Sequence, residues 1–479
     1  MRVGPLEVGT LQQWQPVTGS AISWQPTKAC LAKAAQAPLS DVPIGYMQAQ
    51  HIRGYLTQKA AGLDYSRLMV VSCDSPGQCD VRAMTYVVNT HLRRQDTYRS
   101  WFQHTGDGQI VRRALENPAD IEFAPVRHGE MTLDEVRELV VGTPDPLNWD
   151  CFRFGIIQSA DHFTFYASID HVHVDAMIVG VTLMDFFMMY SALVGGGGPV
   201  AVPDPGSFEK FCIEQNRYTS GLTLESPEIR AWTDYAHNNG GSFPQFPLSL
   251  GDPSIPTTSD IVTVSMMDEE QTANFESVCV SAGSRFIGGV FACSALAEQE
   301  LTGAATYYGL TPKDTRRSTA DAMTQGWFTG LIPVTVPIAG RSFGEAARAA
   351  QVSFDTGRHL AAVPYDRVLE LAPDLSRPRP NFPVVNFLDA GTAPLSVLLT
   401  AELGDLNVGV YGDGRYSYQM SIYVIRVQKE TAVTVMYPDN PIARESVDRY
   451  LEVLKAVFQR IAESGRHREP LEVTASSVG

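Results

Sequence analysis

Hydrophobic residues recur along this chain with two different periods, which predicts a mixture of strands and helices. Residues 163–169 are aromatic and β-branched, as in a strand packed on at least one face. Residues 176–194 form the most apolar helix-like run, with Asp175 at the expected N-cap and the glycines 195–198 ending it. The chain therefore passes from strand to turn to helix here, an arrangement that presents turn side chains at the end of a sheet.

The same periods predict elements along the rest of the chain. Helices are expected at residues 27–37, 47–55, 81–94, 132–141, 207–219, 226–237, 268–282, 286–302 and 443–464, and strands at residues 66–73, 148–158, 260–267, 305–311, 383–389 and 417–427. Thr132 and Glu135 have the spacing of a capping box. Residues 1–45 carry several prolines and glycines and, apart from one short helix, predict an irregular leader on the surface.

Length and composition predict two lobes. A chain of 479 residues is too long for one ordinary core, and the Pro-rich residues 199–205 suggest a boundary. We expect an N-terminal lobe of residues 1–205 and a C-terminal lobe of residues 206–479. With 44% apolar and 19% charged residues, both lobes can bury a core.

Charge and cysteine content narrow the possible partners. A net charge of −16 argues against nucleic acid and against electrostatic docking on an anionic membrane. Seven cysteines without a Cys-x-x-Cys pair predict reduced, buried thiols. The N-terminus lacks a signal-peptide pattern, so we expect a cytoplasmic protein. Asp185 interrupts the apolar run 176–194, which predicts a buried helix between lobes and not a membrane span.

The segment Asp-His-Val-His-Val-Asp at residues 170–175 concentrates the candidate chemistry, and three interpretations of it compete. In the first, Asp175 only caps a helix and both histidines are ordinary residues. In the second, His171, His173 and Asp175 alternate along one strand face and bind a metal, as in a metal-dependent hydrolase. That pattern resembles the opening of the metallo-β-lactamase motif, with Ala176 in place of its closing histidine. In the third, His171 and Asp175 form a His-x-x-x-Asp pair.

The third interpretation resembles the motif His-His-x-x-x-Asp-Gly of the chloramphenicol-acetyltransferase-like and condensation-domain superfamily. This chain has Asp170 for the first histidine and Ala176 for the glycine. Residues 94–102 are similar to a second segment of that family, with Gln95 in place of a histidine. Arg316 followed by Gly326 is similar to a third. The family's Asp-Phe-Gly-Trp-Gly motif is missing, and residues 412–416 stand roughly where it would be.

Over its whole length the chain most resembles the mycobacterial polyketide-synthase-associated acyltransferases, first those of polyacyltrehalose assembly and then those of sulfolipid assembly. Residues 149–152, 323–330 and 437–441 carry that resemblance most specifically. The resemblance implies an α/β fold of two chloramphenicol-acetyltransferase-like lobes. Each lobe would be a mixed sheet flanked by helices, with the active site in a channel between them.

A neutral histidine near its ordinary pKa suits a general base, so we assign that role to His171. The oxyanion would be met by backbone N–H groups near residues 174–176, at a helix N-terminus. The resemblance implies that Asp175 pairs with an arginine of the second lobe, for which Arg316 is the candidate. His173, Trp327 and Asn386 are expected along the substrate channel. Gln50 and Arg99 are expected to be buried, hydrogen-bonded scaffold.

The resemblance implies an O-acyltransferase that moves long-chain fatty or polyketide acyl groups from coenzyme A or a carrier to trehalose or acylated trehalose. Sulfolipid assembly is the alternative, and amide formation or a silent lipid-carrier role are further ones. We expect no metal and no cofactor other than the acyl-coenzyme A substrate. A polyketide synthase and a lipid transporter are expected partners of a monomer, which is cytoplasmic or peripheral at the inner face of the membrane.

Overall fold

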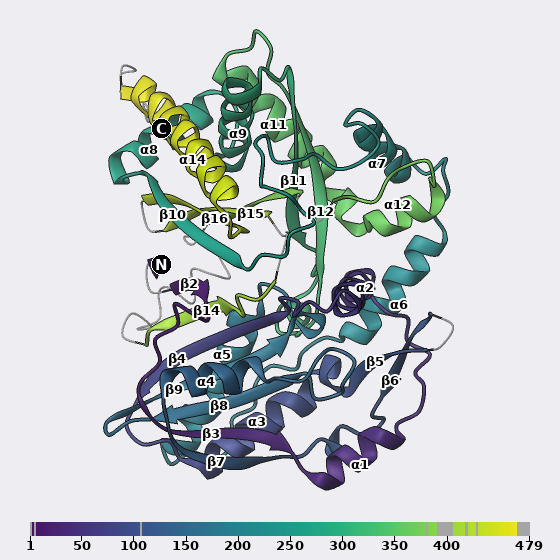
Figure 1. Ribbon diagram of the computed structural model, residues 1–479, viewed down its shortest axis with the longest axis vertical. Coiled ribbons are helices and arrows are strands. Elements are labelled where there is room, and N and C mark those ends of the chain that lie inside the picture. Colours follow the sequence, from purple (N-terminus) through teal and green to yellow (C-terminus); the bar gives the residue numbers. More distant parts are fainter. Residues whose placement is uncertain are drawn as a thin grey trace, which may run out of the picture.

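The structure is a computed structural model and describes residues 2–3, 6–105, 108–379, 382–389, 406–416, 420–427 and 430–466. Within those ranges the strands form an eight-stranded sheet, a four-stranded sheet and two two-stranded sheets. Figure 1 shows the eight-stranded sheet in one half of the molecule and the four-stranded sheet in the other, with helix α2 (Tyr46–Ala60) near their junction. The expected two-lobed α/β arrangement is therefore present.

The large sheet has the strand order β1-β2-β14-β4-β9-β8-β3-β7. Its strands are β1 Arg2–Val3, β2 Leu6–Thr10, β14 Val408–Gly412, β4 Leu68–Pro76, β9 His162–Asp170, β8 Phe152–Gln158, β3 Gly19–Pro26 and β7 Phe123–Met131. All neighbours are antiparallel except β2 and β14, which run parallel. The expectation of an irregular leader at residues 1–45 is wrong, because β2 and β3 are both integral strands of this sheet.

Helices cover both faces of the large sheet. Helices α3 (Val81–Arg94) and α5 (Ile178–Val194) pack on the face that carries Val71 of β4. Helix α4 (Leu133–Val141) packs on the opposite face, which carries the neighbouring Val70. This alternation follows from the period of two along a strand. The first lobe also contains α1 (Lys28–Gln36) and the strand pair β5 (Ser100–His104) and β6 (Ile110–Ala114).

The second lobe is built on the order β10-β16-β15-β13 and on the pair β11-β12. These strands are β10 Ser259–Met267, β16 Glu430–Pro438, β15 Met420–Val427, β13 Pro383–Asp389, β11 Thr306–Asp314 and β12 Thr329–Pro337. Its helices are α6 Phe208–Ser220, α7 Pro227–His237, α8 Glu269–Ser281, α9 Phe286–Thr302, α10 Thr319–Ala322, α11 Phe343–Gly357, α12 Tyr365–Leu371 and α14 Pro441–Arg466. Helix α14 buries an apolar stripe that consists of Val447, Tyr450, Leu451, Leu454 and Val457.

The sheet of the first lobe contains one strand from the later part of the chain. Strand β14, although it lies far beyond residue 206, joins the large sheet between β2 and β4. The boundary between residues 205 and 206 stays a prediction.

Helix α5 is held by its buried polar residues. Asp185 has no exposed side-chain surface and accepts hydrogen bonds from His91 Nδ1 (2.9 Å) and Arg94, both on α3. Thr182 accepts a hydrogen bond from the Gln325 amide of the second lobe at 2.7 Å. Among the described residues no single helix is long and apolar enough to cross a membrane, although α8 and α9, bent by 97°, meet that test as a pair.

Candidate active site

The turn that carries the predicted chemistry follows the central strand β9. His171, Val172 and His173 form one 3-10 turn, and α5 begins only at Ile178. Asp170 stabilises the turn by accepting the Val172 N–H at 3.0 Å. Asp175 accepts the Met177 N–H at 3.0 Å and lies three residues before Ile178, the first residue of the helix. The helix therefore starts later than expected, and Met177, not Asp175, occupies the N-cap position.

His171 lies against Trp327 of the second lobe. The ring centroids are 3.9 Å apart, with an angle of 32° between the planes. Nδ1 of His171 is buried and has no hydrogen-bond partner among the described residues. Burial of the ring, with a smaller contribution from His51, lowers the pKa of His171 from 6.5 to about 4. The imidazole is therefore neutral at physiological pH, which is the form that can accept a proton.

Asp175 and Arg316 meet across the two lobes. Nη1 and Nη2 of Arg316 donate to the two carboxylate oxygens of Asp175 at 2.8 and 3.1 Å, and each side chain is 4% exposed. The Phe328 N–H donates to the same carboxylate at 2.9 Å. Burial raises the pKa of Asp175, and the hydrogen bonds from Arg316 oppose that rise. The carboxylate faces Arg316 and is fully engaged there, which suits a structural pair and not a proton carrier.

His173 does not line an open channel, which corrects the expected placement. Its side chain is 0% exposed, and its ring packs against Tyr98 and Phe152 at centroid distances of 5.6 and 5.7 Å. Nδ1 of His173 shares a hydrogen bond of 2.9 Å with Thr97. In a strand His171 and His173 would share one face, but the 3-10 turn sends the two rings to different neighbours.

Of the other two expected channel residues, Trp327 lies at the site and Asn386 has no described contact with it. Trp327 is partly exposed and touches His171, so the structure brings it to the site. Asn386 lies on β13, and its only side-chain hydrogen bond within the described ranges goes to the Val384 carbonyl at 3.4 Å. No contact described for Asn386 joins it to His171 or Trp327.

The residues of the metal interpretation do not converge on one point. Asp175 binds Arg316, His173 binds Thr97, and His171 faces Trp327. In the part of the chain that the structure describes, no group of three His, Cys, Asp or Glu side chains is placed to hold an ion. A metal site needs its donors within bonding distance of one ion, and this turn directs them apart.

A third histidine lies at the site, and the sequence analysis did not single it out. His51 of α2 has ring centroid distances of 6.2 Å to His171 and 5.6 Å to Trp327. Its Nε2 makes a 2.8 Å hydrogen bond to the fully buried Asp170. The other oxygen of Asp170 accepts from Arg67 Nη1 at 2.9 Å. Burial would raise the pKa of Asp170, but its contacts with His51 and Arg67 outweigh burial and lower it.

Sequence similarity places this site within a known family. The profile of the Condensation domain family matches residues 43–477. The chain belongs to the condensation domain family. Acyltransferase PapA3 of Mycobacterium tuberculosis is 70% identical over 468 residues, which cover 98% of this chain and 99% of that protein. 2'-acyl-2-O-sulfo-trehalose (hydroxy)phthioceranyltransferase PapA1 of the same species is 55% identical over 479 residues, which cover 100% and 93%.

Structural similarity agrees with these relationships. A solved structure of PapA2 acyl transferase matches with a TM-score of 0.92 and 51% identity over 95% of this chain and 100% of that one. The resemblance to the mycobacterial polyketide-synthase-associated acyltransferases and the predicted fold class are both confirmed. This condensation-domain protein is an enzyme that transfers acyl groups.

The departures from the family motif have local explanations. Asp170 replaces the first histidine of the motif and binds His51, which supplies an imidazole from another element. Gln95 replaces the histidine of the second segment and joins α3 to the second lobe. Its amide donates to the Met323 carbonyl at 3.0 Å, and its oxygen accepts the Gln325 N–H at 2.9 Å.

Gly326, which matches the third family segment, has a φ of 154°. A Cβ at this position would lie 2.3 Å from the Phe208 ring.

Gln50 and Arg99, the two residues expected to be buried scaffold, differ in their exposure. Gln50 is exposed, so its assignment as buried scaffold is wrong, and Gln48 occupies the buried position on the same helix. Gln48 Nε2 donates to the Val172 carbonyl at 2.9 Å and its oxygen accepts from Arg112 at 2.9 Å. Arg99 is partly buried, and its guanidinium donates to Glu209 at 3.1 Å.

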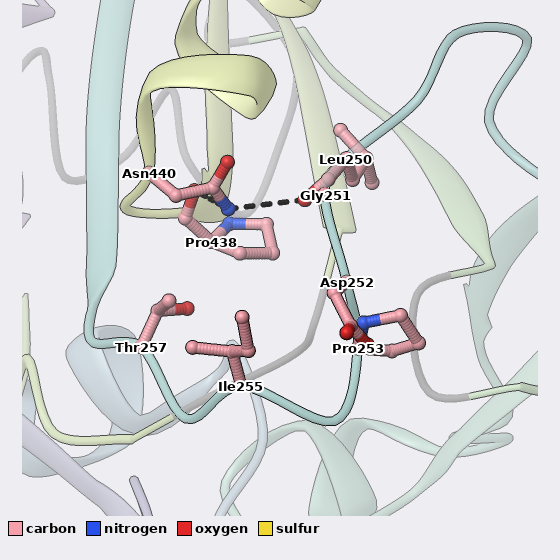
Figure 2. A pocket seen from close by; sticks show the side chains of 8 residues that line it. All are labelled: Leu250, Gly251, Asp252, Pro253, Ile255, Thr257, Pro438 and Asn440. Carbon is pink, nitrogen blue, oxygen red and sulfur yellow. Dashed lines mark hydrogen bonds between the residues drawn. The ribbon is translucent and has the colours of Figure 1, made fainter.

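Two cavities lie outside this site. The smaller, of about 10 Å³, separates residues 250–257 from Pro438 and Asn440 (Figure 2). Asn440 spans it with a 3.0 Å hydrogen bond to the Leu250 carbonyl, and the space suits at most one water molecule. The larger, of about 170 Å³, lies between α2 and α12, where Arg53 pairs with Asp366. Neither cavity has His171 or Trp327 in its lining.

Proposed function

We propose that this enzyme transfers long-chain fatty or polyketide acyl groups from a coenzyme A or carrier thioester to a hydroxyl of trehalose or acylated trehalose. The single observation that carries the proposal is the neutral His171, held beside Trp327 at the end of β9. The names of two relatives support a trehalose-based acceptor, because PapA1 and PapA2 are named for acyl transfer to sulfated trehalose. No cofactor beyond the acyl thioester is part of the proposal.

In the proposed reaction His171 acts as general base. It takes the proton of the acceptor hydroxyl while the hydroxyl oxygen forms a bond to the thioester carbonyl carbon. The tetrahedral oxyanion then collapses, the carbon–sulfur bond breaks, and the thiolate leaves with the proton that His171 returns. The products are the sugar ester and the free thiol, and no covalent acyl-enzyme forms.

The oxyanion would be met by backbone N–H groups of the turn. The Val174 N–H donates to the His171 carbonyl at 3.3 Å, so Val174 drops out of the set predicted from the sequence. The N–H groups of Asp175 and Ala176 have no partner among the described residues, which leaves them as the candidates. A preorganised backbone donor of this kind typically contributes about 2.7–4 kcal/mol to transition-state stabilisation.

The remaining partners hold the base in place. The Trp327 ring covers one face of the His171 imidazole and limits rotation of the ring. Arg316 fixes Asp175, four residues beyond the base, and at the same time joins the second lobe to the turn. A displacement of about 1 Å in such a site is enough to slow catalysis roughly a hundredfold.

Sulfolipid assembly is a second candidate, favoured by the 55% and 52% identical relatives whose names specify sulfated trehalose. Its acceptor would differ only by a sulfate group. Purified enzyme with palmitoyl-coenzyme A and either trehalose or trehalose-2-sulfate, followed by mass analysis, separates the two. Acylation of trehalose supports the first proposal, and acylation of the sulfated sugar alone supports the second. Absence of both products would refute the function.

The cellular setting follows from the proposed chemistry. A long-chain or polyketide donor needs an enzyme that builds the chain, for which we propose a polyketide synthase as partner. The acylated sugar is amphipathic, so we propose that the enzyme lies in the cytoplasm, peripheral at the inner face of the membrane, and delivers its product to a lipid transporter. We also propose that the enzyme is a monomer. Fractionation of cells and gel filtration of the purified protein test the location and the monomeric state.

A further inference from the structure

A second imidazole lies beside the reacting centre, and the mechanism above does not use it. His51 comes from α2, and its ring lies near both His171 and Trp327, at centroid distances of 6.2 and 5.6 Å. Helix α2 presents Gln48, His51, Ile52 and Tyr55 on its buried face. His51 therefore faces the turn of residues 171–173.

Buried charges fix the orientation of His51. Its Nε2 lies 2.8 Å from Asp170, whose other oxygen accepts from Arg67 at 2.9 Å. Arg67 is itself 5% exposed and donates to the carbonyls of Thr143 and Pro144. An ionised carboxylate only accepts hydrogen bonds, so Nε2 of His51 carries the hydrogen. In neutral His51 the lone pair is then at Nδ1.

The second nitrogen of His51 is not engaged by the protein. Among the described residues no hydrogen bond reaches Nδ1, and the side chain keeps 6% exposure. A buried ion pair such as Arg67–Asp170 is costly to desolvate and seldom adds net stability. Here the buried carboxylate of Asp170 orients the His51 imidazole next to the base. Because this pair adds little stability, ligand binding explains the arrangement better than packing does.

We propose that His51 is an acceptor-binding residue whose Nδ1 receives a hydrogen bond from a second hydroxyl of a polyhydroxy acceptor. The inference rests on the proposed function and deepens it, because it names the substrate class that the site selects. His171 would take the proton of one hydroxyl, while His51 holds another hydroxyl of the same sugar. A site built to bind a hydroxyl rejects acceptors that lack it, because its polar group would then stay unpaired.

The test compares two acceptors with one variant. His51→Gln can retain an N–H near the position of Nε2, and so keep the bond to Asp170, while it removes the ring nitrogen Nδ1. We expect kcat/KM for trehalose to fall about tenfold, the effect of one neutral hydrogen bond, with a rise in acceptor KM. Transfer to cyclohexanol, which has one hydroxyl, and the KM for palmitoyl-coenzyme A should not change. His237→Gln, at an exposed histidine paired with Asp374, is the control and should behave as wild type.

Each outcome decides the proposal. An equal loss with trehalose and cyclohexanol, in parallel with a lower melting temperature, would assign His51 to the scaffold and overturn it, as would unchanged kinetics with both acceptors. If the variant does not fold, monodeoxy-trehaloses with wild-type enzyme replace it. The proposal then requires that removal of at least one hydroxyl that is not acylated costs about tenfold. A wild-type enzyme that acylates cyclohexanol as well as trehalose contradicts it. An enzyme that acylates neither of these acceptors nor trehalose-2-sulfate refutes the proposed function itself.

Discussion

Arg316 binds Asp175 with two nitrogens, at 2.8 and 3.1 Å, although the two residues lie 141 positions apart in the sequence. Both side chains are almost fully buried. This contact ties the turn after β9 to the segment that leads into β12, and the same segment places Trp327 on His171. The geometry of the base therefore depends on the contact between the lobes.

Asp175→Ala should destabilise the protein and slow transfer, since it leaves a buried guanidinium without its partner. Breaking such a pair typically costs about 3–5 kcal/mol, and Arg316→Ala should cost a similar amount. Thermal unfolding of both single variants and the double variant measures the coupling. We expect the double variant to lose much less than the sum of the singles.

The exposed pair Arg285–Asp355 is a matched control for that cycle. Its side chains are 56% and 45% exposed, so its coupling should lie below about 1 kcal/mol. Strict additivity at Asp175 and Arg316 would show that the two residues do not stabilise each other.

His173→Ala should lower stability but preserve the turnover of each folded molecule. Its ring is fully buried against Tyr98 and Phe152, so truncation leaves a cavity and an unpaired Thr97 hydroxyl. Activity should also survive exhaustive treatment with a chelator, and elemental analysis should find no bound transition metal. One zinc per chain, lost together with activity, would restore the metal interpretation.

Much of the secondary structure could be predicted because its signals are local. The capping box of Thr132 and Glu135 is present, with hydrogen bonds in both directions. Helix α9 and strand β13 begin and end at the expected residues. In each case side-chain period and capping chemistry act within a few residues, and tertiary contacts do not override them.

The missed features depend on contacts between distant segments. Strand β2 is short and gains its place by pairing with β14, some 400 positions later in sequence, which no local pattern shows. His51 was missed for a similar reason, because its carboxylate partner Asp170 comes from β9. A signal did exist, since Gln48 and His51 are polar residues on the face of α2 that also carries Ile52 and Tyr55. Polar residues on such a face indicate buried hydrogen bonds or a site.

Glu298→Gln should stabilise the protein at pH 8 and have less effect at pH 5. Burial on α9 raises the pKa of Glu298 from 4.5 to about 7. The folded state therefore binds its proton more tightly than the unfolded state, and stability falls as the pH rises from about 4.5 through 7. Denaturant unfolding at both pH values measures the difference. An equal effect at both, or the same effect from exposed Glu130→Gln, would contradict this assignment.

The pH dependence of kcat/KM should reflect the low pKa of His171. Because the neutral imidazole is the active form, kcat/KM should stay level from pH 8 to about pH 5 and fall only near pH 4. Circular dichroism at each pH shows whether the protein remains folded. An acid limb near pH 6.5 in folded protein would mean that the environment of His171 does not lower its pKa.

The central claim is that His171 is the base of acyl transfer, and one variant tests it most directly. Wild type, His171→Gln and His171→Ala are incubated with trehalose and palmitoyl-coenzyme A at pH 7.5, and the acylated sugar is quantified by mass spectrometry. His171 is partly exposed and its Nδ1 has no partner, so both variants should keep the wild-type melting temperature within a few degrees. We predict that each forms product at least about a hundredfold more slowly than wild type, the lower range for loss of a general base. Wild-type rates of product formation in either folded variant would contradict the account.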